Sequence, residues 1–350
     1  MAEHEVILAG EEPQFFEGVE KLLEVWFTRE DGRIDNCNLR KIPRHQLVSL
    51  LKIVRCEIIS SVQNDQLDSY VLSESSMFVS QRRFILKTCG TTTPLQCLEP
   101  LLLLVTKYAG FDAVEDVYYS RKNYKRPELQ QSPHCNFEQE VAVLDSFFKD
   151  GAAYCLGSVN RDCWYLYTLH PLRGPRRGTT EPDQTLEIMM TDLDPEIMSI
   201  FTREECSSAA EATLRSGIDK LLPDMIIDDY LFEPCGYSMN GISKTEEGPK
   251  LASGCYMTIH ITPEPEFSYV SFESNVPLES YKEVIMRVVK TFRPGKFVLA
   301  VFANKTSVAA KAPRELEKEA SFGDWLRHDV HYCRFKSYDL TYALYSKFPS

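Results

Sequence analysis

The sequence predicts an α+β fold in which antiparallel sheets carry helices on their outer faces. Strand-like runs rich in aromatic and β-branched residues outnumber helix-like runs in both halves of the 350-residue chain. These runs do not follow the regular strand–helix–strand order that is typical of parallel sheets. No short repeat, low-complexity tract or disordered linker divides the chain.

The first half contains two predicted helices among several predicted strands. One amphipathic helix is expected over residues 18–28, because apolar residues recur there at helical spacing: Val19, Leu22, Leu23, Trp26 and Phe27. A second helix is expected from about Pro94 to Tyr108. The expected strands are Glu57–Val62, Tyr70–Leu72, Arg83–Cys89, Ala152–Val159 and Asp162–Leu169, the last two joined by a turn at Asn160-Arg161. Residues 121–135 and 170–182 are expected to be loops.

The second half repeats this mixture of strands and helices. The expected strands are Gln184–Thr191, Tyr256–Thr262, Ser268–Glu273, Phe297–Phe302, His331–Phe335 and Leu340–Tyr345. Helices are expected over Glu204–Leu214 and Tyr281–Phe292, the latter stopped by Pro294-Gly295.

The composition argues against several classes of protein. The formal net charge is −12 and no basic run is long enough to grip a phosphate backbone, so neither nucleic acid nor an anionic membrane is expected as a partner. We expect no signal peptide in the acidic segment Met1 to Gln14, and the most apolar run, Leu101 to Val105, is too short to span a bilayer. The 11 cysteines, an odd number without a CxxC pair, indicate free thiols and a reducing, cytosolic location.

Common catalytic motifs are absent from the sequence, but seven less common stretches are present. There is no P-loop, GxGxxG, HExxH or GxSxG motif, and the 7 histidines show no metal-ligand spacing, so no metal site is expected. The seven stretches are Phe15–Glu24 (FFEGVEKLLE), Tyr70–Met77 (YVLSESSM), Lys87–Thr91 (KTCGT), Tyr119–Asn123 (YSRKN), Pro182–Glu187 (PDQTLE), Pro234–Gly241 (PCGYSMNG) and Thr258–Phe267 (TIHITPEPEF).

Together these stretches resemble the eukaryotic, animal-type S-adenosylmethionine decarboxylase family and follow its order. The resemblance implies a four-layer α/β/β/α sandwich of two antiparallel sheets in one domain over residues 1–350, with a weakly matched tail at 303–350. It also implies decarboxylation of S-adenosylmethionine to the aminopropyl donor for spermidine and spermine synthesis. The implied cofactor is a covalent pyruvoyl group that the chain makes from its own Ser75.

The resemblance places a self-cleavage site at Glu74-Ser75. By itself, the stretch Ser73–Ser76 is a polar turn or a phosphorylation site, because Ser-rich loops are common. In the family pattern, the Ser75 hydroxyl attacks the Glu74 carbonyl, and elimination of the resulting ester leaves a dehydroalanine that becomes the pyruvoyl group. This chemistry needs a hydroxyl, backbone strain and a nearby base. Cleavage would give a small chain, 1–74, and a large chain, 75–350.

Two residues resemble the family's helpers in cleavage. Ser238 resembles the serine that supports the first step, and His260 resembles the base that removes the Ser75 α-proton. By itself, a lone histidine in a strand is more often a satisfied sheet residue. On the strand 256–262, His260 shares a face with Thr258 and Thr262, and this polar face suits either a site or solvent.

Cys89 resembles the residue that donates the proton replacing CO₂ on the substrate. By itself a buried cysteine is a small apolar residue, but a thiol with a reference pKa of about 8.5 is protonated at neutral pH, as a proton donor must be. The implied decarboxylation is Schiff-base chemistry, in which the substrate amine condenses with the pyruvoyl ketone. Glu17 and Glu20 complete the candidate catalytic residues.

A further group resembles the family's substrate-binding residues. Phe16 and Phe232 match the pair that sandwiches the adenine, although each is equally compatible with an ordinary core position. Phe16 can also face the sulfonium, since aromatic rings attract cations. Glu264 matches the carboxylate that binds both ribose hydroxyls, and the backbone at Leu72 and Glu74 would line the same pocket.

Acidic residues form a further cluster that the sequence alone would assign to solvated faces. Glu17, Glu20 and Glu24 fall in a narrow sector of the first predicted helix, and residues 183–187 alternate acids on one strand face. The resemblance implies that these acids surround putrescine, an activator, inside the sandwich. The implied ligands are Glu24, Lys87, Asp183, Thr185, Glu187 and Glu273.

The chain departs from the family pattern in places. The segment between Gly241 and Cys255 is several residues longer, Tyr118 stands where phenylalanine is usual, and Tyr338 is the expected diamine-contacting tyrosine. The alternatives are an inactive family member that acts as a regulatory partner, and an acidic binding protein. The active enzyme is favoured because all four residues assigned to cleavage and proton transfer are present: Ser75, Cys89, Ser238 and His260. A homodimer joined at sheet edges is also implied.

Overall fold

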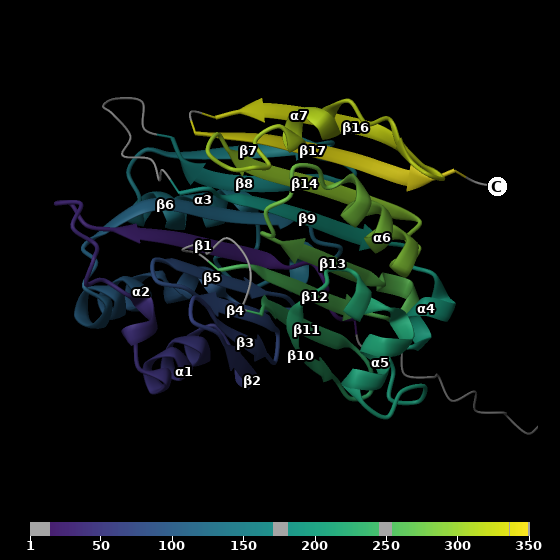
Figure 1. Ribbon diagram of the computed structural model, residues 1–350, viewed down its shortest axis with the longest axis horizontal. Helices are drawn as coiled ribbons and strands as arrows, with labels where there is room; N and C mark the ends of the chain where they lie inside the picture. The colour runs from purple at the N-terminus through teal and green to yellow at the C-terminus, as the bar shows by residue number, and fades with distance from the viewer. Residues whose placement is uncertain (1–14, 171–180, 245–253, 336, 349–350) are drawn as a thin grey trace, which may run out of the picture.

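The computed structural model describes residues 15–170, 181–244, 254–335 and 337–348, which form two antiparallel sheets. The first sheet is built from the first half of the chain (Figure 1). Its strand order is β2 (Ile58–Gln63), β3 (Asp68–Leu72), β4 (Ser75–Val79), β5 (Arg83–Thr88), β1 (Lys21–Thr28), β6 (Ala113–Lys122), β8 (Cys163–Leu169) and β7 (Gly151–Gly157).

The second sheet uses strands from the second half and contains nine strands in the described residues. Its order is β10 (Met225–Leu231), β11 (Tyr237–Ser243), β12 (Tyr256–Thr262), β13 (Tyr269–Ser274), β9 (Gln184–Thr191), β14 (Lys296–Asn304), β17 (Tyr338–Lys347), β16 (Trp325–Arg334) and β15 (Ser321–Phe322).

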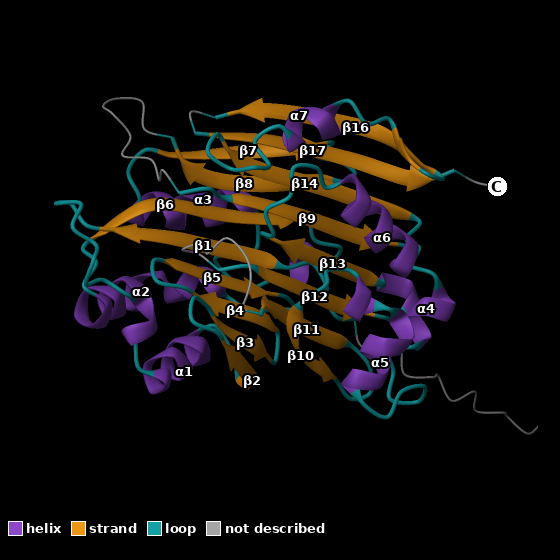
Figure 2. Cartoon of the chain, in the orientation of Figure 1, coloured by secondary structure: helices purple, strands orange, loops and turns teal. Residues whose placement is uncertain are grey.

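Helices cover the outer face of each sheet, and the strands lie between them (Figure 2). The first sheet packs against α1 (Arg44–Ile53), α2 (Leu98–Leu104) and α3 (Phe137–Phe147), and the second against α4 (Pro195–Ser199), α5 (Ala209–Ser216), α6 (Lys282–Phe292) and α7 (Ala312–Glu317). Each outer face has its own large apolar core. The prediction of a four-layer sandwich of antiparallel sheets is confirmed.

The layer between the sheets contains aromatic and charged side chains, whereas the two outer cores are mainly apolar. Aromatic contacts join the sheets there, for example Phe78 of β4 against Tyr256 of β12, with ring centres 4.5 Å apart. Trp26 of β1 packs in a cluster with Met189 and Val298 of the second sheet. Many buried charged side chains share this layer, and they form the sites described below.

The predicted helix over residues 18–28 is wrong, because residues 21–28 form strand β1 and residues 18–20 lead into it without helical structure. Leu23, Val25 and Phe27 pack under the helices, whereas Leu22 and Trp26 face the other sheet. A strand buried on both faces carries apolar residues at nearly every position, and such a run can imitate helical spacing. Glu17, Glu20 and Glu24 therefore do not lie in one sector of a helix, as the sequence analysis predicted. Glu24 instead shares one face of β1 with Leu22 and Trp26, and this face lies between the sheets.

The other predicted helices and strands are confirmed, most of them with shifted ends, and several elements are missing from the prediction. The loop expected over residues 170–182 lies mostly outside the described residues. The helix expected over Glu204–Leu214 begins only at Ala209, and the strand expected from His331 begins at Trp325. The residue 121–135 loop contains the end of β6 and a short 3-10 turn. The sequence did not predict α1, α3, α4, α7, β4, β6, β10, β11 or β15.

Candidate active site

A cavity of about 630 Å³ opens between the two sheets at one end of the strands. Segments far apart in the sequence line it: the approach to β1, the β3–β4 turn, the end of β5, the 232–238 segment and the end of β12. The lining includes all the residues predicted for cleavage and proton transfer, together with most of those predicted to bind substrate: Phe16, Glu74, Ser75, Cys89, Phe232, Ser238, His260 and Glu264.

Ser75 sits at a strained turn in this cavity. Leu72 and Ser75 pair across the β3–β4 hairpin, so Ser73 and Glu74 form its tip. The backbone of Ser75 has φ of 123°, a region that L-residues with side chains rarely occupy, and the residue is buried. Strain of this kind persists only where the surrounding structure enforces it, and it is common at functional sites.

The Ser75 hydroxyl points to a buried carboxylate. Ser75 Oγ donates to Glu20 Oε1 at 2.8 Å, and Glu20 lies directly before β1. Burial raises the pKa of Glu20, against the opposing effects of the Lys87 charge and of the hydrogen bond from Ser75. Glu20 is therefore a hydrogen-bond acceptor with raised proton affinity at the reacting hydroxyl.

His260 lies at the centre of a buried polar cluster. Its Nδ1 lies 2.9 Å from Ser238 Oγ, and its Nε2 lies 2.8 Å from Thr258 Oγ1 and 2.9 Å from Ser76 Oγ. Burial, assisted by the charge of Lys87, lowers the pKa of His260 to about 3, so the ring is neutral at pH 7. A neutral imidazole is the form that accepts a proton.

The sequence analysis missed two members of this cluster, Ser76 and Asn240. Ser76 Oγ donates to Asn240 Oδ1 at 2.6 Å, and Asn240 Nδ2 donates to the Tyr70 carbonyl. Ser76, and not Ser75, is the β4 serine in hydrogen-bond contact with His260. Both residues lie inside the stretches Tyr70–Met77 and Pro234–Gly241, but the family resemblance gave neither of them a role. The alternation of side chains along a strand could have found Asn240, because it lies two residues after Ser238 on β11 and therefore shares its face.

Cys89 follows the last residue of β5 and lies beside Glu74. Its amide donates to the Glu74 carbonyl at 3.1 Å, and its Sγ is 3.9 Å from Glu74 Oε2. Burial and the neighbouring carboxylates raise the pKa of the Cys89 thiol, so it keeps its proton at neutral pH. Burial also raises the pKa of Glu74 to about 7.

The predicted substrate-binding residues are brought together with one exception. Phe16, Phe232 and Glu264 all line the cavity, and Glu264 Oε2 is a buried acceptor with no hydrogen-bond partner among the described residues. The Leu72 side chain instead packs in the core under the helices, so only its backbone pairing shapes the site.

Glu17 lies beside this cavity, without a contact to the reacting groups. Its Oε2 accepts hydrogen bonds from the amides of Lys125 and Arg126 at 2.9 and 3.1 Å. Its carbonyl accepts from the amide of Gly90 at 2.8 Å. The contacts indicate that Glu17 anchors the loop after β6, and its predicted catalytic role stays a prediction.

The predicted acidic cluster is real and lies between the sheets, where Lys87 holds three of the acids. Lys87 Nζ is 2.7 Å from Glu273, 3.0 Å from Glu187 and 3.5 Å from Glu20. All four side chains are buried, and the carboxylates raise the pKa of Lys87 well above its usual value against the effect of burial. Glu20 thus contacts both the cluster and the Ser75 hydroxyl.

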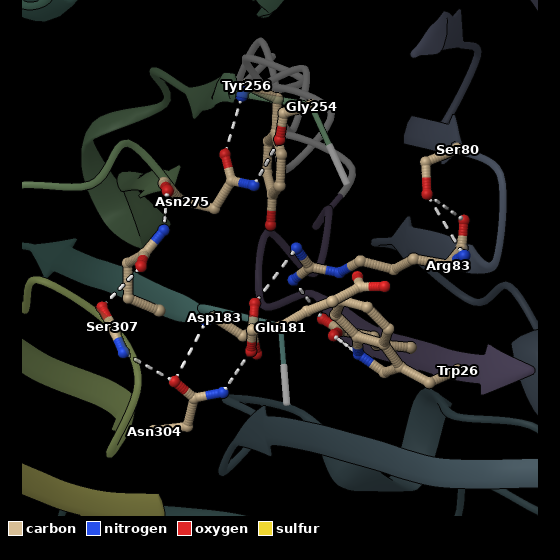
Figure 3. A network of polar contacts seen from close by, with 12 residues as sticks. Trp26, Ser80, Arg83, Glu181, Asp183, Gly254, Tyr256, Asn275, Asn304 and Ser307 are labelled. Carbon is tan, nitrogen blue, oxygen red and sulfur yellow. Dashed lines mark hydrogen bonds and ion pairs between the residues drawn. The ribbon is translucent and has the colours of Figure 1, made fainter. Parts of the chain in front are cut away.

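A second buried cation, Arg83, holds the remaining acids. Arg83 Nη2 is 2.8 Å from Glu24, and Nη1 is 3.6 Å from Asp183 (Figure 3). Tyr338 donates to the same Asp183 at 3.0 Å. The sequence analysis did not assign Arg83, because an arginine on a strand is usually exposed.

Carboxylates still exceed cations in this cluster. Five acids (Glu20, Glu24, Asp183, Glu187 and Glu273) surround two cations. Burial and the charge of Asp183 raise the pKa of Glu24 to about 7, and burial raises the pKa of Glu187. A small cavity of about 50 Å³ adjoins these groups. Its lining includes Thr185, the remaining predicted diamine ligand, and Tyr118, which stands where the family usually has phenylalanine.

Comparison with known proteins identifies the family. The family model for adenosylmethionine decarboxylase matches residues 13–346. The chain is 53% identical over 342 residues to the S-adenosylmethionine decarboxylase proenzyme of Drosophila melanogaster, covering 95% of each chain. It is 48% identical over 333 residues to the proenzyme of that name from Xenopus laevis, covering 95% of this chain and 96% of the relative.

The chain belongs to the adenosylmethionine decarboxylase family. Its fold also matches a crystal structure of the Trypanosoma brucei AdoMetDC-delta26 monomer, with a TM-score of 0.59 and 26% identity, over 78% of this chain and 99% of that one. The family resemblance predicted from the seven sequence stretches is therefore confirmed.

Two further predictions concerned membrane-spanning segments and the long segment between Gly241 and Cys255. No helix in the described residues has the length and apolar character needed to cross a membrane. The longer segment between Gly241 and Cys255 lies mostly in residues 245–253, outside the described residues.

Proposed function

We propose that the chain cleaves itself at Glu74-Ser75 and then decarboxylates S-adenosylmethionine to supply aminopropyl groups for polyamine synthesis. The observation that carries this proposal is the strained Ser75, whose hydroxyl donates to Glu20 inside the cavity. A surface turn would relax to a favoured conformation and would expose its serine. Family membership and the printed names of the relatives point to the same activity.

The first step is an N-to-O acyl shift at the strained bond. Ser75 Oγ attacks the Glu74 carbonyl carbon while Glu20 accepts the hydroxyl proton. The C–N bond breaks, the Ser75 nitrogen takes up a proton, and Glu74 becomes an ester on Ser75 Oγ. Relief of the unfavourable backbone conformation favours the shift, since such strain is worth on the order of 1–3 kcal/mol.

The second step is a β-elimination for which His260 is the base. Neutral His260 removes the Ser75 α-proton, the Cβ–Oγ bond breaks, and Glu74 leaves as a carboxylate at the end of the small chain. The dehydroalanine left on the large chain hydrolyses to a keto group with loss of ammonia. Ser238 and Thr258, which hydrogen-bond the two ring nitrogens, fix the orientation of the imidazole.

The pyruvoyl group formed from Ser75 would supply the electron sink for loss of CO₂. The chain's own residues hold the substrate around it. Phe16 and Phe232 contact the adenine faces, and Glu264, with its unpaired buried oxygen, accepts from the ribose hydroxyls. Cys89 keeps its thiol protonated and donates that proton to the substrate carbon after CO₂ leaves.

The acidic cluster supports putrescine as an activator. Its five acids outnumber Lys87 and Arg83 by three, and two further ammonium groups on a flexible stem would offset two of these three carboxylates. The 50 Å³ cavity, which is lined by acids of this cluster and by Tyr118, is the place for putrescine in this proposal. The signal reaches the chemistry through Lys87 and Glu20, which link the cluster to Ser75.

A homodimer and a cytosolic location complete the proposal. The sheets end in the strands β2, β7, β10 and β15, whose open edges suit pairing with a second copy. All 11 cysteines are free thiols, which fits a reducing compartment.

Denaturing electrophoresis of the purified protein tests self-cleavage directly. The wild type is expected to run as fragments 1–74 and 75–350, with the larger one blocked at its N-terminus. Ser75→Ala is expected to stay intact, and His260→Ala to stop at an ester that hydroxylamine cleaves. A folded wild type that remains a single band contradicts the proposal.

A further inference from the structure

Lys21 is a buried lysine to which the proposed chemistry gives no role. It begins β1, and its register partners are Thr88 of β5 and Arg121 of β6, which places it beside the strand end that precedes Cys89. Its exposed fraction is 0%. A buried ammonium is costly unless a charge or a function compensates for the loss of solvation.

The contacts of this ammonium are all with neutral groups. Lys21 Nζ donates to the Gly90 carbonyl at 2.9 Å and to Gln130 Oε1 at 3.1 Å, and it lies 5.4 Å from the centre of the Tyr124 ring. In the part of the chain that the structure describes, no carboxylate forms an ion pair with it. Gly90 follows Cys89 directly, so Lys21 holds the turn that carries the thiol.

The nearby carboxylates are already paired with other groups. Glu140 accepts two hydrogen bonds from Arg121 Nε, at 2.8 and 3.0 Å, and Glu17 accepts from two backbone amides of the loop after β6. The titratable groups that interact with Lys21 across its surroundings are Glu17, Cys56, Glu74, Cys89, Arg121, His134 and Glu140. When Cys89 loses its proton, the negative charge of the thiolate favours the charged form of Lys21.

We propose that Lys21 is a positioning residue for Cys89. Its ammonium fixes the turn after the thiol and stabilises the thiolate that proton donation leaves behind. In that step the S–H bond breaks, the proton goes to the substrate carbon, and the electron pair stays on Sγ, near the carboxylates of Glu74 and Glu20. Without a neighbouring cation, this thiolate would be formed in a buried site next to two acids.

This inference rests on the proposed role of Cys89 as the proton donor, and the titration of Lys21 agrees with it. Burial lowers the pKa of Lys21 to about 8. The side chain therefore carries its charge at pH 7 and loses it in mildly alkaline solution. Above pH 8 the cation that stabilises the thiolate disappears.

The test measures the Cys89 thiol itself. Processed protein is treated with iodoacetamide from pH 6.5 to 10, and mass spectrometry of the Cys89 peptide gives the labelling rate. Lys21→Met is expected to label about tenfold more slowly at pH 7, where the wild-type Lys21 carries its charge, and at the wild-type rate above pH 9, where the wild-type Lys21 is neutral. Its kcat is expected to fall about tenfold with KM unchanged, because substrate binding does not involve the thiolate.

Thr92→Val is the matched control for a purely structural role. Thr92 Oγ1 donates to the Cys89 carbonyl at 2.6 Å, so this variant loosens the turn and leaves the contacts of Lys21 with Gly90 and Gln130 in place. Its labelling profile is expected to follow the wild type. Lys21→Arg, which keeps the charge, is expected to retain the profile within about twofold. If Lys21→Met does not fold, Lys21→Gln replaces it in the same comparison.

Two outcomes overturn the inference: a neutral Lys21 variant whose labelling profile overlays that of the wild type, or a Thr92→Val profile that is shifted equally. Failure of the proposed function appears separately. If Cys89→Ala decarboxylates normally, Cys89 is not the proton donor, while the labelling profiles still decide whether Lys21 acts on its thiol.

Discussion

At the scale of single residues, buried carboxyl, imidazole and thiol groups differ in proton affinity because their neighbours differ. His260 is held neutral by burial and by Lys87, whereas Cys89 is held protonated by burial and by two acids. One group is thus prepared to accept a proton and the other to donate one. The cavity of about 630 Å³ therefore contains a neutral proton acceptor, His260, and a protonated donor, Cys89, at neutral pH.

Cys89→Ala separates cleavage from catalysis. We expect this variant to cleave itself and to lose decarboxylation by about 10²–10⁴-fold, the usual contribution of a general acid. Gel densitometry gives the cleavage and released CO₂ gives the turnover. Turnover near the wild-type rate rules out Cys89 as the donor.

Glu20→Gln tests the acceptor of the Ser75 proton. The amide keeps the size of the side chain but is a far weaker base, so self-cleavage is expected to slow by about 10²-fold or more. The precursor is followed by pulse labelling during cell-free synthesis. Glu57→Gln, at an exposed position, is the control and should cleave normally. Equal cleavage rates in both variants would show that Glu20 accepts no proton.

At the scale of elements, β1 and β5 present different chemistry on their two faces. Leu23, Val25 and Phe27 of β1 pack under the helices, while Glu24 faces the other sheet and meets Arg83 of β5. The strict alternation of a strand lets one element build an apolar core and a polar site at the same time.

Arg83→Met tests how strongly this strand pair depends on its buried cation. Removing one partner of a buried ion pair leaves Glu24 and Asp183 uncompensated, so the free energy of unfolding should fall by about 3–5 kcal/mol. Urea denaturation at pH 7.5 measures it. Arg29→Met, which breaks an exposed pair with Asp31, is the control and should lower the free energy of unfolding far less, because solvent screens an exposed pair. Equal losses would contradict a structural role for Arg83.

At the scale of the whole molecule, two sheets enclose an acidic layer that neither sheet contains alone. Glu20, Glu24 and Lys87 come from the first sheet or its approach, while Asp183, Glu187 and Glu273 belong to the second or directly precede it. Closing the sandwich therefore concentrates negative charge in a poorly solvated region. Cations or protons must balance that charge.

The pH dependence of putrescine activation follows from this balance. Burial raises the pKa of Glu24 to about 7, so below pH 7 the carboxyl carries a proton and no longer attracts an ammonium. The concentration of putrescine for half-maximal activation should therefore rise as pH falls from 8 to 6. Rate titrations at constant ionic strength measure it, with potassium chloride as the screening control.

Two variants make this prediction specific. Glu24→Gln is expected to flatten the pH dependence, and Asp183→Asn to lose the diamine response. Equal stimulation by potassium chloride, or tighter putrescine binding at pH 6 than at pH 8, contradicts the proposed site.

The sequence by itself determined the family and the antiparallel α+β class, and it predicted most of the residues that line the candidate active site. Motifs such as those around Ser75 and His260 are contiguous in the chain, so they can be read without knowing the fold. The alternation at 183–187 also predicted correctly that three side chains share a face. These features depend on local sequence order, which is fully present in the sequence.

Only the tertiary structure decided how those residues meet. Residues 18–28 carry apolar side chains on both faces, and only the second layer shows that they form a strand. The pairing of Arg83 with Asp183, the contact of Ser76 with His260 and the burial of Lys21 all join segments far apart in the chain. Burial and charge pairing depend on which elements pack together, and local patterns do not contain that information.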